Sequence, residues 1–425
     1  MAYADDASYE AYDDYDGGDD PRFERRRRKK RHPLRSFVAV IGVLALLGVV
    51  AIGGYAFYLQ RTVSQNVEHQ DLLAKENAVI TISPNLTGGN QPGTEDGDPS
   101  DEGAGAPDEE AGDTSDKAAD PSTGEDGEDE GVAPLVDEDG EELDYQGGEI
   151  TATTPERDPR AGDALNFLII GSDSRDLSVE RGRSDVIILM HISGDRERVD
   201  LIHFPRDLFV PIAGTGGSSK INAAYSYGGA PLLVQTLQPL VNVPIDHVVI
   251  TNFESFKAMT DAIGGVTVQV TEAGGGFSTG AHHMNGEQGL RFVRERYSLS
   301  QGDISRGERQ MQFIKGIMNK ALSVDTLTNP ARVANFVDAA TSNLTVDRDL
   351  QVSDMRDLGF SMRNVRGGDI HFWQGPWCGI SNHPVAGSIV VMAGSQMGVL
   401  SEHLRTDSMS SYVDNVSPRS GFGGC

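Results

Sequence analysis

The sequence predicts an α/β domain in which helices cover both faces of a central sheet, preceded by one N-terminal transmembrane helix. Three observations support this prediction. Short apolar segments typical of buried strands alternate with longer segments that have the apolar spacing of helices. The stretch 37–59 contains no charged residue. Between that stretch and the first strand of the domain lies a long acidic segment rich in Gly, Pro, Ser and Thr.

The N-terminal region has the pattern of a single-pass membrane anchor. A helix over 37–59 spans roughly 35 Å at about 1.5 Å per residue, enough to cross a hydrocarbon core of ~30 Å. Residues 1–36 are expected to form a disordered tail, because the first 24 are acidic and have no apolar period. The tail is expected in the cytoplasm, because the basic run from Arg25 to Arg31 flanks the apolar stretch. A cleaved signal peptide is disfavoured, since the stretch is too long and no clear cleavage site follows. We therefore expect a single-pass cell-membrane protein with its N-terminus in the cytoplasm and its C-terminal domain outside.

The chain carries a net charge of −28, with 64 acidic and 36 basic residues. Such an acidic balance excludes nucleic acid as a general partner. We expect residues 60–159 to be an acidic extracytoplasmic linker, because this composition gives a solvated, self-repelling tether. The two cysteines, Cys378 and Cys425, form no CxxC motif. An exported domain allows a disulfide between them, and two unpaired thiols remain the alternative.

The folded domain is expected over 160–415, with a flexible tail over 416–425. Its expected strands are 166–170, 186–192, 199–204, 247–250 and 266–270, and its expected helices are 231–240, 253–263 and 306–322. A turn at 193–195 joins two of these strands and predicts a hairpin.

Charged residues gather where apolar strands begin or end. Asp173 directly follows the first strand, where ligands of open α/β sheets bind, although an ordinary Asx turn explains it equally. The hairpin places Arg183 and Asp185, before one strand, next to Arg206 and Asp207, which follow the other. We expect these charges to meet at one end of the sheet. The alternative is a pair of surface salt bridges, which contribute little.

Two further segments extend this pattern. If residues 292–296 are extended, Arg294 and Arg296 point to one face, whereas in a helix they diverge. Arg306 and Gln310 are four residues apart and share a face that continues into the buried stripe of a long helix. A charged residue at the start of such a stripe needs a partner, and an anion near the helix N-terminus is one.

Two interpretations of these charges compete. In one, they neutralise one another as a structural network. In the other, the arginines bind a diphosphate through bidentate forks, and Asp173 and Asp185 hold Mg²⁺ or Mn²⁺ against it. The arginines outnumber these carboxylates, so positive charge is expected to remain. Each charge-assisted hydrogen bond contributes roughly 1.5–3 kcal/mol, which favours a bound anion.

The same segments, in this order, resemble the LytR-CpsA-Psr family of bacterial cell-envelope proteins. The matching stretches are NFLIIGSDSR, GRSDVIILMHI, VDLIHFPRDLFVPI, KINAAYSYGG, HMNGEQGLRFVRERY and GDISRGERQMQFIKGI. The resemblance implies a three-layer α/β/α sandwich with a central mixed sheet and a pocket for a lipid. It also implies a phosphotransferase that moves a glycopolymer of the teichoic acid, arabinogalactan or capsule type from a polyprenyl diphosphate carrier to peptidoglycan.

Site residues follow from this resemblance position by position. Asp173 and Asp185 match the metal-binding carboxylates. The residues around the diphosphate are matched by Arg183, Arg206, Arg294, Arg296, Arg306 and Gln310. The expected catalytic set is Asp173, Arg206, Asp207, Arg294 and Arg296. Three positions depart from the family pattern, namely Val186, His203 and Ser305, and none of them removes a charge.

The expected reaction is direct displacement, because no Ser-His or Cys-His pair is recognisable. An acceptor hydroxyl attacks the phosphorus nearest the sugar, and Asp173 or Asp207 accepts its proton. The prenyl tail would lie against Leu232, Leu233, Leu237, Phe313 and Ile317, for which ordinary core packing is the alternative. Two other functions stay open. One is a lipid-diphosphate pyrophosphatase, and the other is a non-enzymatic envelope scaffold or attenuator, although no helix-turn-helix is discernible.

Overall fold

The computed structural model describes residues 51–83, 132–172 and 184–414. The chain divides into the units Met1–Phe57 and Tyr58–Cys425, and the fold below belongs to the second. Within the described residues, no helix is both long and apolar enough to cross a membrane. The transmembrane helix expected over 37–59 falls mostly on residues 37–50, which lie outside the described part.

A mixed sheet of seven strands, in the order β1-β12-β9-β4-β5-β6-β13, forms the centre of the domain. Its strands are β1 (Val67–Gln70), β4 (Leu165–Ser172), β5 (Ser184–Ile192), β6 (Val199–Phe204), β9 (His247–Asn252), β12 (Leu344–Asp347) and β13 (Ile370–Gln374). The antiparallel pairing of β5 with β6 confirms the predicted hairpin. Since β4 pairs parallel with β9 and antiparallel with β5, the expected mixed central sheet is confirmed.

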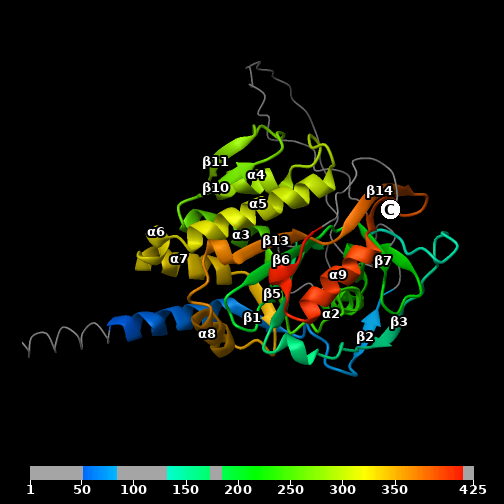
Figure 1. Cartoon of the computed structure of the whole chain (residues 1–425), viewed down its shortest axis with the longest axis horizontal. Coiled ribbons are helices and arrows are strands. Elements are labelled where there is room, and N and C mark those ends of the chain that lie inside the picture. The colour runs from blue at the N-terminus through cyan, green and yellow to red at the C-terminus, as the bar shows by residue number, and fades with distance from the viewer. Residues whose placement is uncertain (1–50, 84–131, 173–183, 415–425) are drawn as a thin grey trace, which may run out of the picture. The chain divides into compact units, whose positions relative to one another are not determined.

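Helices cover both faces of this sheet, as Figure 1 shows for α2 and α9 on one side and α5 on the other. Side chains of a strand alternate between faces, so Leu168 and Ile170 join the cluster under α2 and α9, while Phe167 joins the cluster under α5. The long helices are α2 (Ile221–Val241), α3 (Phe253–Ala262), α4 (Gly286–Arg294), α5 (Asp303–Ala321), α7 (Pro330–Thr341), α8 (Val352–Ser361) and α9 (Gly394–Arg405). The short helix α6 (Val324–Leu327) joins α5 to α7.

Three smaller sheets complete the domain. The sheet β14-β15-β7-β8 continues from the end of β6, and its strands are β7 (Leu208–Pro211), β8 (Ser218–Lys220), β14 (Trp377–His383) and β15 (Gly387–Met392). The hairpin of β10 (Val266–Val270) and β11 (Gly280–Met284) packs against α4 and α5 around Phe292 and Phe313. The expected strand over 266–270 is therefore present, but it lies outside the central sheet.

Parts of the expected linker over 60–159 belong to the folded domain. Strand β1 pairs with β12, and β2 (Val79–Ile82) pairs with β3 (Gly148–Thr151). Leu135, Ile82 and Ala152 are fully buried in the cluster under α2. Leu135 is an isolated apolar residue in an acidic background, so no local pattern marks it as part of the core. The linker boundaries therefore differ from the expected ones at both ends.

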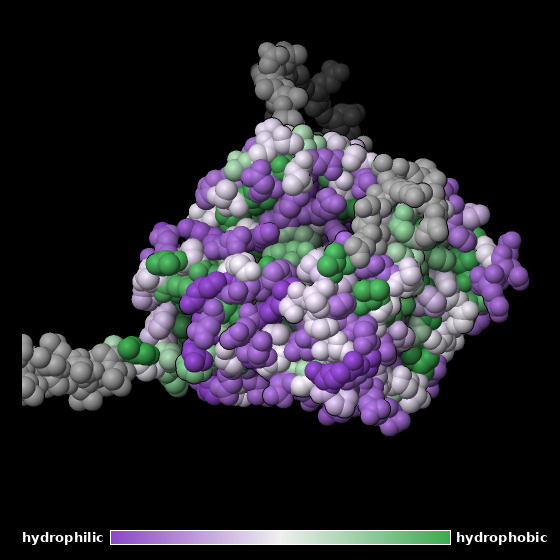
Figure 2. Space-filling model, in the orientation of Figure 1, coloured by the Kyte–Doolittle hydropathy of each residue, from purple (hydrophilic) through white to green (hydrophobic). Residues whose placement is uncertain are grey.

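On the face shown in Figure 2, apolar side chains form small patches between polar ones. Scattered apolar exposure of this kind is normal for a globular domain. Function is therefore better sought in the charged cluster at the sheet end than on this surface.

Candidate functional site

The hairpin of β5 and β6 brings Asp185 next to Arg206. Their register pairs Ile187 with Phe204, so the start of β5 lies beside the end of β6. Arg206 Nη1 donates a hydrogen bond of 2.8 Å to Asp185 Oδ1. Asp207 lies at the same end, with its Oδ2 4.0 Å from Arg206 Nε. The predicted meeting of these three side chains is confirmed.

The first turn of α5 adds two charges to this cluster. Arg306 Nη2 lies 2.6 Å from Asp303 Oδ1 and 3.7 Å from Asp185 Oδ1. Asp303 Oδ1 is also 3.0 Å from Arg206 Nε. Arg206 and Arg306 therefore approach the carboxylates Asp185 and Asp303 from two different elements, the sheet and the helix. We call these four residues, with Asp207, the arginine cluster.

Burial makes the charges of the arginine cluster strongly dependent on one another. Arg206 is only 6% exposed. Burial alone would lower the pKa of Arg206, but Asp303, Asp207 and Asp185 together raise it above its ordinary value. Burial raises the pKa of Asp303, while Arg306 and Arg206 act in the opposite direction. Arg206 therefore stays charged, and the three carboxylates beside it stabilise that charge.

Lys220, at the end of β8, extends the cluster on the side of α2. Its Nζ lies 3.2 Å from Asp207 Oδ1. The backbone fixes this corner, because Asn222 N donates to Arg206 O at 3.2 Å and Val390 N donates to Asp207 O at 2.9 Å. The chain passes here from the central sheet to the second sheet, so Asp207 has little freedom to move.

The cluster differs from expectation in its charge balance. Arg206, Arg306 and Lys220 face three carboxylates, because Asp303 joins Asp185 and Asp207. Within the described part of the chain, the expected excess of arginine over carboxylate is therefore absent from this cluster. Asp303 and Lys220 were not among the expected site residues. The spacing of Asp303 and Arg306, one helical turn apart, is the signal that could have identified the former.

Several buried polar atoms around the cluster have no hydrogen-bond partner among the described residues. They include Ser184 Oγ, Asp303 Oδ1, Arg306 Nη2 and Gln310 Oε1. Arg306 Nη2 is close to Asp303, but without the geometry of a hydrogen bond. Gln310, 4% exposed, lies one turn beyond Arg306 on α5, as the predicted shared face requires. A buried donor without a partner favours a ligand that accepts a hydrogen bond.

Neither the extended nor the helical alternative holds for the whole stretch 292–296, because α4 ends at Arg294. Arg294 is the last residue of α4 and is exposed, and the backbone becomes extended at Glu295. The guanidinium of Arg296 lies 4.8 Å from the centre of the Tyr297 ring, and its Nη2 donates to the Tyr297 hydroxyl at 2.9 Å. Their position beside a diphosphate stays a prediction.

Only part of the expected metal site lies among the described residues. Asp173 and Arg183 lie outside the described residues. The remainder contains no group of three or more His, Cys, Asp or Glu side chains that could hold a metal ion. Of the two expected metal ligands, only Asp185 lies among the described residues, and one of its oxygens already faces Arg206 and Arg306. Metal binding at Asp185 therefore needs Asp173 and a phosphate oxygen as further ligands.

His203, one of the positions expected to depart from the family pattern, packs against Gly307. A Cβ at position 307 would lie 2.4 Å from His203 Cε1, so glycine is the residue that leaves room for the ring. Burial lowers the pKa of His203 to about 4, with a smaller contribution from Arg306 in the same direction. His203 Nδ1 and Gln374 Oε1 are 3.2 Å apart. A neutral imidazole thus fills the seam between β6 and α5, next to the arginine cluster.

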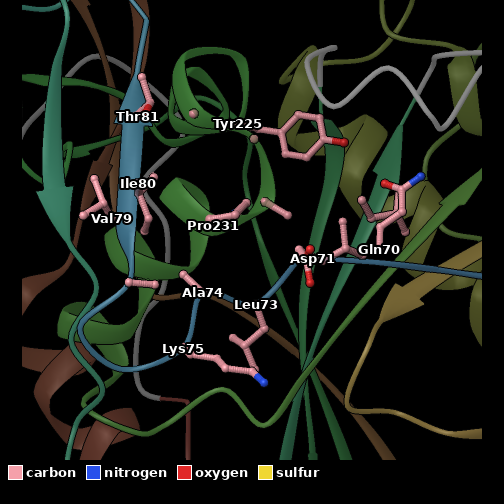
Figure 3. A pocket seen from close by; sticks show the side chains of 16 residues that line it. Gln70, Asp71, Leu73, Ala74, Lys75, Val79, Ile80, Thr81, Tyr225 and Pro231 are labelled. Carbon is pink, nitrogen blue, oxygen red and sulfur yellow. The ribbon is translucent and has the colours of Figure 1, made fainter.

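A separate cavity of about 560 Å³, lined by both apolar and polar residues, lies at a break in α2. Gly229 has a φ of 65°, which favours glycine, and Pro231 follows it. Figure 3 shows Tyr225 and Pro231 of α2 around this cavity, with Ile80 of β2 and Leu73 on its other sides. The side chains expected along the prenyl tail do not line it. Leu232, Leu233, Leu237, Phe313 and Ile317 are buried in two separate clusters, so for them the core alternative holds.

Cys378, in β14, is disulfide-bonded. Cys425 is the other cysteine of the sequence and lies outside the described residues. The alternative of an unpaired thiol at position 378 therefore does not hold.

Comparisons with known proteins agree with this architecture. A family model described as the LytR_cpsA_psr family matches residues 137–405. The chain is similar to the polyisoprenyl-teichoic acid–peptidoglycan teichoic acid transferase TagU of Bacillus subtilis (strain 168), with 35% identity over 190 residues, 44% of this chain and 61% of that relative. TagU of Enterococcus faecalis is 33% identical over 208 residues, 48% of this chain and 67% of that relative. The matched segments thus span about two thirds or less of these relatives.

A solved structure gives the same fold. The crystal structure of protein gbs0355 from Streptococcus agalactiae matches with a TM-score of 0.51 and 21% identity, over 61% of this chain and 92% of that one. At this identity the likeness concerns the fold alone.

Proposed function

Since the chain belongs to the LytR-CpsA-Psr family, we propose that it transfers a glycopolymer from a polyprenyl diphosphate carrier onto peptidoglycan. The observation that carries the proposal is the arginine cluster, in which two buried arginines from different elements converge at the end of the central sheet. The names of the relatives support the same reaction class, because TagU is a polyisoprenyl-teichoic acid–peptidoglycan teichoic acid transferase. The polymer itself is of the teichoic acid, arabinogalactan or capsule type.

In this proposal the arginines bind the diphosphate. Arg206 and Arg306 hold it at the end of β6, and Arg183, Arg294, Arg296 and Gln310 surround it. Arg306 Nη2 is ion-paired with Asp303 but makes no hydrogen bond among the described residues, and a phosphate oxygen would accept one. The balanced charge of the cluster implies that the anion competes with Asp185 and Asp303 for the arginines. Binding therefore requires rearrangement of these ion pairs or a cation that compensates the added charge.

The chain's own residues then orient the acceptor and receive its proton. An acceptor hydroxyl attacks the phosphorus nearest the sugar, and polyprenyl phosphate leaves. Asp173 or Asp207 accepts the proton of the hydroxyl. Mg²⁺ or Mn²⁺, held by Asp173 and Asp185, would neutralise charge on the diphosphate.

The proposed substrate and location fit the remaining features. The cavity at the break of α2 offers apolar walls for part of a prenyl chain, each buried methylene contributing about 0.8 kcal/mol. A helix over 37–59 would anchor the chain in the cell membrane with its N-terminus in the cytoplasm. The carrier would then be presented at the membrane surface to which the domain is tethered.

Product analysis tests the proposal. The full chain in detergent is mixed with a polyprenyl diphosphate glycan, wall oligomer and Mg²⁺, because β1 and β2 belong to the fold and a fragment starting near residue 150 would lack them. We expect polymer linked covalently to the wall oligomer. Free phosphorylated polymer in its place would identify a pyrophosphatase, and unchanged substrate would favour a non-enzymatic role.

A further inference from the structure

A second cavity, of about 350 Å³, opens beside Arg206 at the beginning of α2. Its two walls have different chemistry. One wall is polar and consists of Arg206, Asp207, Lys220, Asn222 and Ser226. The other wall is formed by small, mostly apolar residues of two segments, Val132 to Pro134 and Val385 to Gly387.

The polar wall is held in place before any ligand binds. Asp207 and Lys220 form an ion pair of 3.2 Å, and their side chains are only 14% and 17% exposed. Backbone hydrogen bonds from Asn222 N and Val390 N fix the carbonyl groups of Arg206 and Asp207. A ligand in the cavity therefore meets a carboxylate and an ammonium group held by their ion pair, together with an amide and a hydroxyl.

The apolar wall is fixed as well. The Tyr227 hydroxyl donates to Ala133 O at 3.0 Å, and Ser219 Oγ donates to Pro134 O at 2.9 Å. On the other segment, His383 Nδ1 accepts hydrogen bonds from Val385 N at 3.2 Å and Ala386 N at 3.3 Å. Neither segment needs to move to leave the cavity open.

We propose that this cavity binds a pyranose ring of a cell-wall or carrier-linked glycan, which deepens the proposed function and rests on it. Hydroxyl groups of a sugar both donate and accept hydrogen bonds, which matches the presence of both acceptor and donor groups on the polar wall. The C–H face of the ring packs on the small apolar wall. Because Asp207 and Lys220 neutralise each other, the wall favours a neutral polyhydroxylated ligand over a second anion.

The cavity lies next to the proposed diphosphate site, so the sugar would take part in the reaction. Arg206 belongs both to the cavity wall and to the arginine cluster, so a sugar hydroxyl in the cavity lies next to the proposed diphosphate. Asp207 then accepts a hydrogen bond from that hydroxyl, and Lys220 keeps Asp207 in place. The ring is either that of the acceptor glycan or the first sugar of the donor, since both meet at the reacting phosphate.

The proposal is tested by a substitution on the apolar wall that places a large side chain in the cavity. Val385 is half-buried and lines the cavity, whereas Ser388, on the same hairpin, is exposed and does not line it. Val385→Trp is compared with Ser388→Trp in the full chain, and circular dichroism verifies that both variants are folded. Calorimetry measures the binding of two separate probes, a soluble peptidoglycan glycan fragment and a short-prenyl diphosphate sugar.

We expect Val385→Trp to weaken the binding of one of the two probes at least about tenfold. Ser388→Trp should bind both probes with the affinity of the wild type. The affected probe identifies the ring as acceptor or donor. Lys220→Met, which leaves the apolar wall intact, should weaken the same probe. If the wild type binds neither probe, or if Val385→Trp binds both unchanged, the sugar site is refuted. If the cavity binds the wall glycan but no wall-linked product forms, the transfer reaction fails and the sugar site stands.

Discussion

Arg206 donates a hydrogen bond of 2.8 Å to Asp185 across the β5–β6 hairpin, although the two residues are 21 positions apart in the sequence. Both side chains are largely buried, and Arg306 and Asp303 of α5 close the ring of charges around them. Buried ion pairs contribute little net stability, yet removal of one partner is costly. An arrangement of this kind suits a site where an anionic ligand replaces the carboxylates as the partner of the arginines.

Arg306→Gln should weaken binding of inorganic pyrophosphate by about 10- to 100-fold, because it removes charge-assisted hydrogen bonds to the anion. It should also destabilise the fold by about 3 kcal/mol, since Asp303 loses its nearest cation. Calorimetry and urea unfolding measure the two effects. Arg332→Gln, which removes an exposed ion pair with Asp325, is the matched control. Equal pyrophosphate affinity in both variants would contradict the role of Arg306.

Gly307→Ala should destabilise the domain by about 1–3 kcal/mol, because the added Cβ collides with the His203 ring. The double variant His203→Ser/Gly307→Ala should recover part of that loss, with a coupling energy of about 1 kcal/mol. Urea unfolding of the four members of this cycle provides the measurement. Additive effects would show that the two residues do not share this space.

The free energy of unfolding should decrease as the pH is lowered, because His203 is buried in its neutral form. Burial lowers its pKa to about 4 from an ordinary value of 6.5, so the unfolded chain binds a proton there that the folded chain does not. The contribution of His203 is present above pH 6.5 and is lost as the pH falls from 6.5 to about 4. The free energy of unfolding should therefore decrease less over this range in His203→Gln than in the wild type. Parallel curves for the two proteins would exclude His203 as the cause.

Asp185→Asn should weaken the binding of Mn²⁺ at least about tenfold in the presence of pyrophosphate, because a hard cation prefers a charged carboxylate. The amide oxygen can still accept the hydrogen bond from Arg206, which limits the effect on the fold. Asp163→Asn, at an exposed position, serves as the control. Electron paramagnetic resonance reports the free Mn²⁺. Unchanged affinity in Asp185→Asn would remove this residue from the proposed metal site.

Thiol labelling of the denatured protein should detect no free cysteine before reduction and both Cys378 and Cys425 afterwards. The expectation follows from the disulfide at Cys378 and from the presence of only two cysteines in the chain. Mass spectrometry of labelled protein gives the count. Label on Cys425 without reduction would show that the two residues are not joined to each other.

The sequence by itself determined the elements and one side of the candidate site. The apolar runs 186–192 and 199–204, with a turn between them, specify a hairpin, and a hairpin places Asp185 beside Arg206 whatever the rest of the chain does. The spacing of Arg306 and Gln310 likewise places them on one helix face. These relationships are local in sequence and follow from the periods of strand and helix.

The tertiary structure alone decided which groups meet across elements. The packing of α5 on the sheet brings Asp303 to Arg206 and balances the charge of the cluster, and it places Gly307 against His203. It also draws β1, β2 and Leu135 from the acidic segment into the core. Such contacts depend on how a helix face and a distant strand fit together in space. No repeat or spacing within either segment contains that information, because contact across a packed interface is a property of both surfaces at once.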